Sequence, residues 1–276
     1  DYIEQHYAES PDLETLAKVA AFSPFHFHRV FGRIMGESVN AYLQRVRLEK
    51  AASRILHESD TSLTVIALDC GFSSSAVFAR SFKQYFGVSA SAFRTQNPLS
   101  GNAEMPVIKQ AKPHHNYPVD VAELERVFLL EMEPLHLAYV RHIGPYDSSV
   151  KPAFERLMRW AGPRGLLREE PWIFGIGYDN PHLTNPQKCR FDACLEIPAE
   201  TTTKEEIGEK WFRPGTCACY PFRGPPEQLE RGFHLLYVWL PDSGYLPADC
   251  PCFMRMSQLG SAREFCCDIC LPVVPL

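Results

Sequence analysis

The segment FHFHRVFGRIMG at residues 25–36 returns in altered form as AVFARSFKQYFG at residues 76–87. A constant offset of 51 residues relates the two copies and matches like with like at four positions: Phe27 and Phe78, Arg29 and Arg80, Phe31 and Phe82, Gly36 and Gly87. Apolar residues recur at helical spacing in both copies, and each copy ends on glycine, which commonly terminates a helix. The chain therefore carries one amphipathic helix twice.

Each repeated helix follows a shorter predicted helix and a tight turn. Ser10-Pro11 gives the first short helix an N-cap and a first-turn proline, and apolar residues follow at helical spacing, namely Leu13, Leu16, Ala17 and Ala20. Ser23-Pro24 repeats this start signal for the next helix, after only a tight turn. The inner face of that helix should hold Phe27, Val30, Phe31 and Ile34, and its outer face should hold Phe25, His28, Arg29 and Arg33.

The outer faces of the repeated helices are basic. Residues 15–36 and 70–103 contain no Asp or Glu, although residues 1–97 as a whole carry ten basic and ten acidic side chains. A short helix, a tight turn and a second helix with a basic face describe a helix-turn-helix whose second member enters the major groove of DNA. A helical bundle with merely solvated basic faces is the alternative, and it explains the phenylalanines but not the missing acids.

A long helix is predicted between the copies, over residues 39–57. Nineteen residues at about 1.5 Å each span about 28 Å. Successive major-groove faces of B-DNA lie about 34 Å apart. A rigid helix of this length can hold two recognition helices about one turn of DNA apart, which explains why the chain needs the repeated helix twice.

Residues 1–97 resemble the DNA-binding domain of the AraC/XylS family of bacterial transcription regulators. The most specific stretch is VIALDCGFSSSAVFARSFKQYFGVSASAFR, residues 65–94, which departs from the family pattern at Ala90, where proline is usual and where Ser89 can still cap the helix. By position, the resemblance implies an all-α domain with two helix-turn-helix motifs and these DNA-binding residues: Phe25, His28, Arg29, Arg33, Ser75, Ala76, Arg80 and Lys83.

The chain changes character at residues 98–120, where prolines and the lack of periodicity predict a linker. Residues 121–276 then read as two strand-helix-strand-strand units, with helices near 147–161 and 225–240. Such an α+β domain would place both helices on one side of a mixed sheet and leave a groove between the units. The whole chain is thus predicted to be multidomain, with boundaries at 1–97, 98–120 and 121–276.

Short phrases of the second domain, among them RHIGPYDSS, GIGYDNP and RFDACLEIP, resemble the gyrase-inhibitor-like effector domain of multidrug-sensing proteins. That family binds bulky, often cationic, aromatic compounds through aromatic rings and a buried carboxylate. The resemblance implies a ligand wall of Tyr146, Trp172, Phe191, Tyr220, Trp239, Met254 and Met256. Met254 and Met256 stand where the family has an acid and a phenol, which predicts a softer, uncharged pocket.

Composition limits the remaining possibilities. The 276 residues carry a net charge of −5, no apolar run long enough for a membrane span and no secretory signal, so we expect a cytoplasmic protein. Ten cysteines, nine of them after residue 188, are expected to be core residues rather than metal ligands, and we expect no cofactor. The predicted function is a ligand-controlled transcription regulator that binds promoter DNA, a small effector and a partner such as RNA polymerase. A hydrolase or a drug-sequestering protein is the alternative, but no nucleophile stands beside a base at recognisable spacing.

Overall fold

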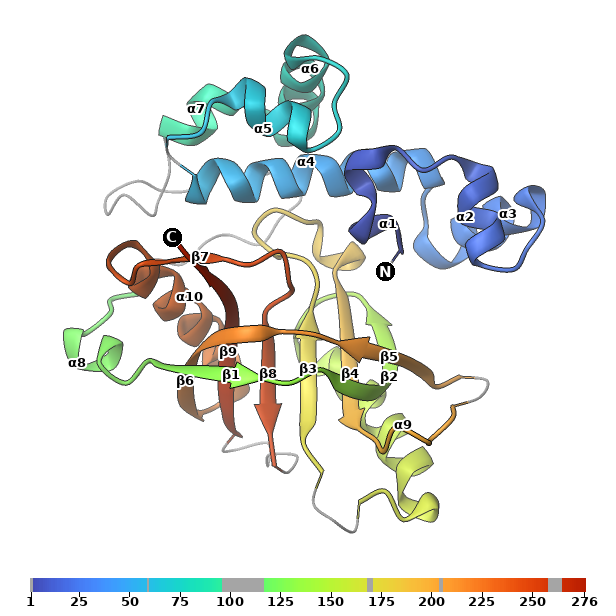
Figure 1. Ribbon diagram of the computed structural model, residues 1–276, viewed down its shortest axis with the longest axis vertical. Helices are drawn as coiled ribbons and strands as arrows, with labels where there is room; N and C mark the ends of the chain where they lie inside the picture. Colours follow the sequence, from blue (N-terminus) through green and yellow to red (C-terminus); the bar gives the residue numbers. More distant parts are fainter. Residues whose placement is uncertain (1, 59, 96–116, 168–170, 204–205, 258–264) are drawn as a thin grey trace. The chain divides into compact units, whose positions relative to one another are not determined.

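The computed structural model divides the chain into two compact units, residues 1–114 and 115–276 (Figure 1). It describes residues 2–58, 60–95, 117–167, 171–203, 206–257 and 265–276. The first unit is helical and the second combines a sheet with helices, so the predicted fold class is confirmed. Of the linker predicted at 98–120, residues 98–116 lie outside the described residues.

The described part of the first unit contains seven α-helices. Their bounds are α1 Tyr2–Gln5, α2 Leu13–Val19, α3 Pro24–Met35, α4 Val39–His57, α5 Leu63–Asp69, α6 Ser75–Phe86 and α7 Ala90–Thr95. Helix α4 has the bounds that the sequence predicted, and the pairs α2–α3 and α5–α6 are the two predicted helix-turn-helix motifs. None of the helices in the described part of the chain combines the length and the apolar character that crossing a bilayer requires.

The two copies begin and end in the same way. The hydroxyls of Ser23 and Ser74 cap α3 and α6, and Gly36 and Gly87 end these helices in the left-handed conformation. Ser89 Oγ accepts a hydrogen bond from the Ala92 N–H at 3.2 Å, so it caps α7 as expected. The cap predicted at Ser10 is wrong, because Asp12 caps α2 instead.

The two recognition helices differ in how deeply they pack. Helix α6 buries Phe78, Phe82 and Phe86, whereas α3 has no fully buried residue. Ile34, predicted on the inner face of α3, is 63% exposed. The prediction for Ile34 is wrong because the last turn of α3 extends beyond the helices that cover it, and periodicity alone does not show where the cover ends.

The second unit contains nine strands and three α-helices in the residues that the structure describes. The strands are β1 Phe128–Met132, β2 Leu135–Ile143, β3 Ile173–Gly177, β4 Arg190–Glu196, β5 Gly208–Phe212, β6 Gly215–Gly224, β7 Tyr245–Pro247, β8 Phe253–Met256 and β9 Phe265–Pro275. The helices are α8 Val121–Leu124, α9 Lys151–Ala161 and α10 Leu229–Trp239. The strand order is β1-β6-β9-β8-β3-β4-β2-β5, with β7 beside β9. The described strand pairs are all antiparallel, so the mixed sheet predicted from the sequence is wrong.

A two-stranded ribbon crosses the sheet and closes it. Strand β1 continues into β2 and β5 continues into β6, and one constant register pairs Phe128 with Cys219 and Tyr139 with Gly208 (Figure 1). The pairing is interrupted only at the crossing, where Pro134 and Pro214 lack the N–H that a ladder needs. The ribbon covers one face of the central strands, and Phe212 of β5 contacts Phe253 of β8 at 5.2 Å between ring centroids.

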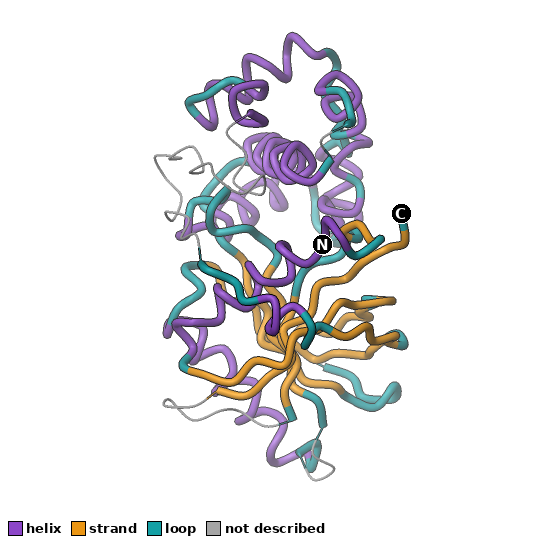
Figure 2. Tube along the Cα trace, turned by 90° about the vertical axis from the view of Figure 1, so that its left-hand side faces the viewer, coloured by secondary structure: helices purple, strands orange, loops and turns teal. Residues whose placement is uncertain are grey.

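Helices α9 and α10 cover the other face of the sheet (Figure 2). Helix α9 packs on β2 and β4, and α10 packs on β6 and β9. The two central strands, β3 and β8, therefore lie between the strands on which α9 and α10 pack. The larger apolar core of the unit fills this layer between sheet and helices.

Candidate functional site

The basic faces of α3 and α6 are open to solvent. All eight predicted DNA-binding residues are exposed, and Phe25 is 78% exposed. The four basic ones, Arg29, Arg33, Arg80 and Lys83, form no hydrogen bond or ion pair with any residue that the structure describes. Their charges thus remain available to an external partner.

The other arginines of this unit are used internally. Arg45 forms ion pairs with Glu37 and Glu49, and Arg54 forms ion pairs with Glu58 and Asp69. Two further arginines, Arg47 and Arg94, donate to the backbone carbonyls of Tyr7 and Thr61. The arginines outside the two recognition helices therefore stabilise the fold, whereas the basic side chains on those helices have no partner among the described residues.

A buried polar network joins α4 to both helix-turn-helix motifs. Arg45 on α4 reaches Glu37 beside the end of α3, and Glu49 on α4 accepts a hydrogen bond from the Tyr85 hydroxyl of α6 at 2.7 Å. Burial and the neighbouring Glu49 charge raise the pKa of Tyr85, so its hydroxyl keeps the proton that it donates. Helix α4 therefore contacts both motifs through buried hydrogen bonds, as expected for a rigid helix that holds the two recognition helices apart.

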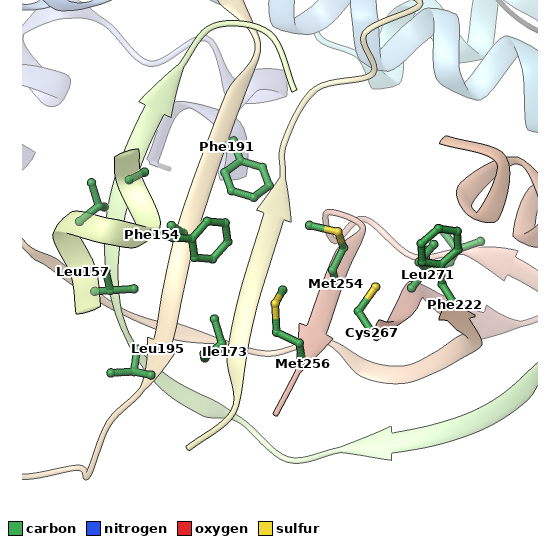
Figure 3. Close-up of a cluster of buried hydrophobic side chains, with 14 of the residues drawn as sticks. Phe154, Leu157, Ile173, Phe191, Leu195, Phe222, Met254, Met256, Cys267 and Leu271 are labelled. Atoms are coloured by element: carbon green, nitrogen blue, oxygen red, sulfur yellow. The ribbon is translucent and has the colours of Figure 1, made fainter. Parts of the chain in front are cut away.

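In the second unit, one row of facing residues crosses six strands on the helix-covered face. Its members, in order across the sheet, are Val140, Ala193, Gly175, Met254, Ile269 and Tyr220. The centre of the row lies on β3 and β8, between the two helices. We call the side chains gathered there the central strip. It consists of Tyr146, Phe154, Phe191, Met254 and Met256 around Gly175. Figure 3 shows Phe154, Phe191, Met254 and Met256.

Gly175 makes room for the central strip. A Cβ at this position would lie 2.7 Å from the Met254 Cε atom and 2.7 Å from the Phe191 Cζ atom, so the thioether and the ring lie directly over the glycine backbone. Phe191 also contacts Tyr146 and Phe154, with ring centroids 5.9 Å and 5.7 Å away. The central strip is thus an aromatic and thioether layer that is closed by the flexible end of a methionine.

The seven predicted ligand residues fall into three places. Tyr146, Phe191, Met254 and Met256 belong to the central strip. Trp239, at the end of α10, lies beside Val121 and Leu124 of α8. Tyr220 lies on β6, and its hydroxyl accepts a hydrogen bond at 3.2 Å from Arg126, two residues after α8. Trp172 lies on the opposite face of the sheet beneath Arg255, whose guanidinium carbon is 4.7 Å from the ring centroid.

The surface beside α8 is a separate shallow groove of about 270 Å³. It is lined by Val121, Leu124, Glu125, Val238, Trp239 and Asp242. An ion pair between Glu123 of α8 and Arg231 of α10, 2.5 Å long, holds its two walls together. Trp239 therefore faces a different space from the one that Phe191 and Met254 fill.

Charged groups of the central strands lie on the face away from α9 and α10. Asp192 is fully buried there and accepts hydrogen bonds from Arg141, Tyr178 and Lys210. Burial alone would raise the pKa of Asp192, but the hydrogen bonds and charges of Arg141 and Lys210 hold that pKa at about 2. Asp192 is therefore an ionised carboxylate that is already neutralised by neighbouring cations.

Sequence reasoning missed Phe154, which belongs to the central strip, and Tyr237, which packs against the same apolar core. Phe154 lies on the buried side of α9, and the hydroxyl of Tyr237 on α10 is 3.5 Å from the Cys252 sulfur. The available signal was helical spacing, since Phe154 stands four residues before Met158 on one side of α9. That spacing identifies a buried face but does not show which strands lie beneath it.

The cysteines of the second unit are mostly packed in its core. Cys219 and Cys270 face each other on β6 and β9 with their sulfurs 3.3 Å apart. Burial raises the pKa of Cys217 and Cys267, which keeps these thiols protonated. Within the described ranges, no group of three or more Cys, His, Asp or Glu side chains converges as metal ligands would.

Comparison with known proteins identifies both parts of the chain. A family model described as a helix-turn-helix domain matches residues 16–96, and one described as a GyrI-like small molecule binding domain matches residues 126–274. An uncharacterized HTH-type transcriptional regulator of Bacillus subtilis, YbfP, is 38% identical over 95 residues, which is 34% of this chain and 32% of that protein. The chain thus spans about a third of the length of this curated relative.

Two solved structures match parts of the chain. The DNA-binding domain of the global transcriptional factor AdpA, in complex with a target DNA, is 31% identical with a TM-score of 0.34, and the match covers 36% of this chain and 89% of that one. A hydrolase from Listeria innocua is 11% identical with a TM-score of 0.43, and the match covers 54% of this chain and 92% of that one.

Proposed function

The chain belongs to the family of GyrI-like small molecule binding domains, which is joined here to an AraC-type helix-turn-helix domain, and from that premise we propose that it is a DNA-binding transcription regulator controlled by a small ligand. One observation carries the DNA-binding part of this proposal. Two copies of a recognition helix present unpaired basic side chains to solvent at two places along one rigid helix, whereas the other arginines of the unit are engaged internally. Phosphates attract such free cations, and base edges are read by arginine.

The residues proposed to contact DNA are those predicted from the sequence. Arg29, Arg33, Arg80 and Lys83 supply the charge, and Phe25, His28, Ser75 and Ala76 supply contacts to base edges and sugars. The second recognition helix starts with Ser75 and Ala76, which form weaker base contacts than His28 and Arg29. We therefore propose that the first motif reads more of the sequence and the second contributes more phosphate contacts.

The ligand part of the proposal is assigned to the central strip. A ligand bound there would lie between α9 and α10, where it can change how these helices pack on the sheet. Control of transcription requires that the ligand bind the DNA-competent state and another state with different affinity. We propose a cytoplasmic sensor without enzymatic activity, in which a ligand is bound in a stoichiometric amount and is not turned over.

Binding to the DNA upstream of the protein's own gene tests the proposal. In fluorescence anisotropy with a labelled fragment, Arg29→Ala should weaken specific binding by about 1–3 kcal/mol, because a base-edge contact is lost. Arg159→Ala removes an exposed arginine from α9 and serves as the charge-matched control that should bind normally. No binding by the wild-type protein to any fragment at low salt would refute the DNA-binding function, and equal loss on random DNA would make Arg29 a phosphate contact.

A further inference from the structure

The acidic side chains of the central strands all point away from the central strip. Ala193, Met254 and Ile269 face the helices, and side chains alternate along a strand. Asp192, Glu196 and Asp268 therefore lie on the opposite face, each one residue away from a residue of the helix-covered core. Asp192 is paired there with Arg141 and Lys210, and Asp268 with Arg255.

Two other partly buried carboxylates of this unit, Asp179 and Glu123, are also paired with arginines, and a third, Glu230, lies beside a histidine. The two arginines are Arg190 and Arg231, respectively, and the His182 ring lies 3.4 Å from Glu230. Glu155 on the same helix as Phe154 is exposed and lies 3.7 Å from Lys151. The residues that form the central strip include no carboxylate, so a cation that entered it would lose water without an anion among the side chains that surround it.

We propose that the central strip binds an uncharged aromatic or branched apolar molecule and discriminates against cations of the same shape. This inference rests on the proposed ligand-sensing function and names its ligand class. Transfer of a charge from water into an apolar site costs far more than transfer of a neutral isostere, unless an opposite charge is present. Cation–π contacts with aromatic faces offset only part of the free energy that the cation loses on leaving water.

Met254 is the residue that decides this preference. Its thioether stands at the centre of the six-strand row and folds over Gly175. A methionine chain has several low-energy rotamers, so it can withdraw from the glycine and let a ligand reach the ring of Phe191. A carboxylate at position 254 would instead attract a cation, but this position holds an uncharged methionine.

Two phenols of equal shape provide the test. The full-length protein is titrated calorimetrically with 4-tert-butylphenol and with (4-hydroxyphenyl)trimethylammonium, which differ only in the carbon or nitrogen at the centre of the bulky group. We expect the neutral compound to bind at least about tenfold more tightly. Equal or tighter binding of the cation would overturn the inference, and so would binding of neither compound. Specific DNA binding by the same preparation would show in both cases that the regulator proposal survives.

Substitutions test which residues cause the preference for the neutral phenol over the cation. Met254→Glu should shift the ratio of the two affinities toward the cation by at least about tenfold, whereas Met254→Gln, which is polar but uncharged, should not. Phe191→Leu should weaken binding of the neutral phenol, and Phe174→Leu, a buried phenylalanine on the opposite face of β3, should leave it unchanged.

Methyl NMR provides a readout that does not depend on the stability of the variants. In wild-type protein with labelled methionine methyls, the Met254 signal should move on addition of the neutral phenol and the Met35 signal in the first unit should not. An unmoved Met254 signal at a saturating phenol concentration would show that the ligand binds elsewhere and would overturn the assignment.

Discussion

At the scale of single residues, the repeat exposes a backbone strain in its first copy. Gly71 turns the chain between α5 and α6 at φ 82°, and the matching position between α2 and α3 is Ala21 at φ 56°. The surrounding hydrogen bonds are the same, since Phe22 and Phe72 donate to Ala17 and Ala67. The left-handed conformation costs an alanine about 1–2 kcal/mol, and it costs glycine almost nothing.

Ala21→Gly should therefore stabilise the first unit by about 1 kcal/mol, because relief of the strained φ exceeds the added freedom of the unfolded chain. Urea denaturation followed by circular dichroism measures the change. Ala20→Gly is the matched control, since Ala20 has φ −82° and gains nothing from glycine. Gly71→Ala should cost more than Ala21→Gly gains, because its Cβ would lie 2.6 Å from the Ala8 carbonyl oxygen. Destabilisation by Ala21→Gly would contradict the strain argument.

At the scale of elements, the two recognition helices share a sequence pattern but not a depth of burial. Helix α6 packs three phenylalanines, and the Phe82 ring also contacts Phe93 of α7 at 5.4 Å. Helix α3 buries none of its residues fully, although Phe31 contacts Tyr42 of α4 at 5.3 Å. Full burial of one such side chain contributes about 1.5–3 kcal/mol, so α3 should open locally more often than α6.

Hydrogen–deuterium exchange followed by mass spectrometry should show this difference. Backbone amides of α3 should exchange at least about tenfold faster than those of α6 in the free protein, with α4 as the protected reference. Specific DNA should slow the exchange of α3 more than that of α6, because binding orders the looser helix. Equal rates in the two helices would mean that partial burial holds α3 as firmly as full burial holds α6.

Helices and strands were predictable where periodicity was strong. Helix α4 and the strands that flank α9 and α10 follow from apolar spacing and from serine and glycine signals. The cap of α2 was not predictable, because Ser10 and Asp12 are equally good capping residues and tertiary contacts select between them. The crossing ribbon was missed for a related reason. Strand β5 is short and half exposed, and its pairing with β2 depends on contacts far apart in the sequence.

At the scale of the whole molecule, the candidate ligand residues were predictable as a set of aromatic and thioether side chains but not as one surface. Phe191 and Met254 meet because β4, β3 and β8 are neighbours in one register. Trp172 directly precedes Ile173, the first residue of β3, and this single step along the chain places it on the other face of the sheet. Register is a long-range property, so a list of candidate residues cannot show which of them meet.

The arrangement of α3, α4 and α6 leads to a prediction about the footprint on DNA. One molecule should protect two major-groove segments on one side of the duplex, with centres about one helical turn apart, because α4 spans about 28 Å between the two motifs. Hydroxyl-radical footprinting, with the stoichiometry measured by analytical ultracentrifugation, tests this. Arg80→Ala should weaken protection of one segment and leave the other, whereas Arg29→Ala should weaken overall binding, because the first motif makes the proposed base-specific contacts. Protection of a single segment, or two segments protected only by two bound molecules, would mean that α4 does not place both recognition helices on DNA at once.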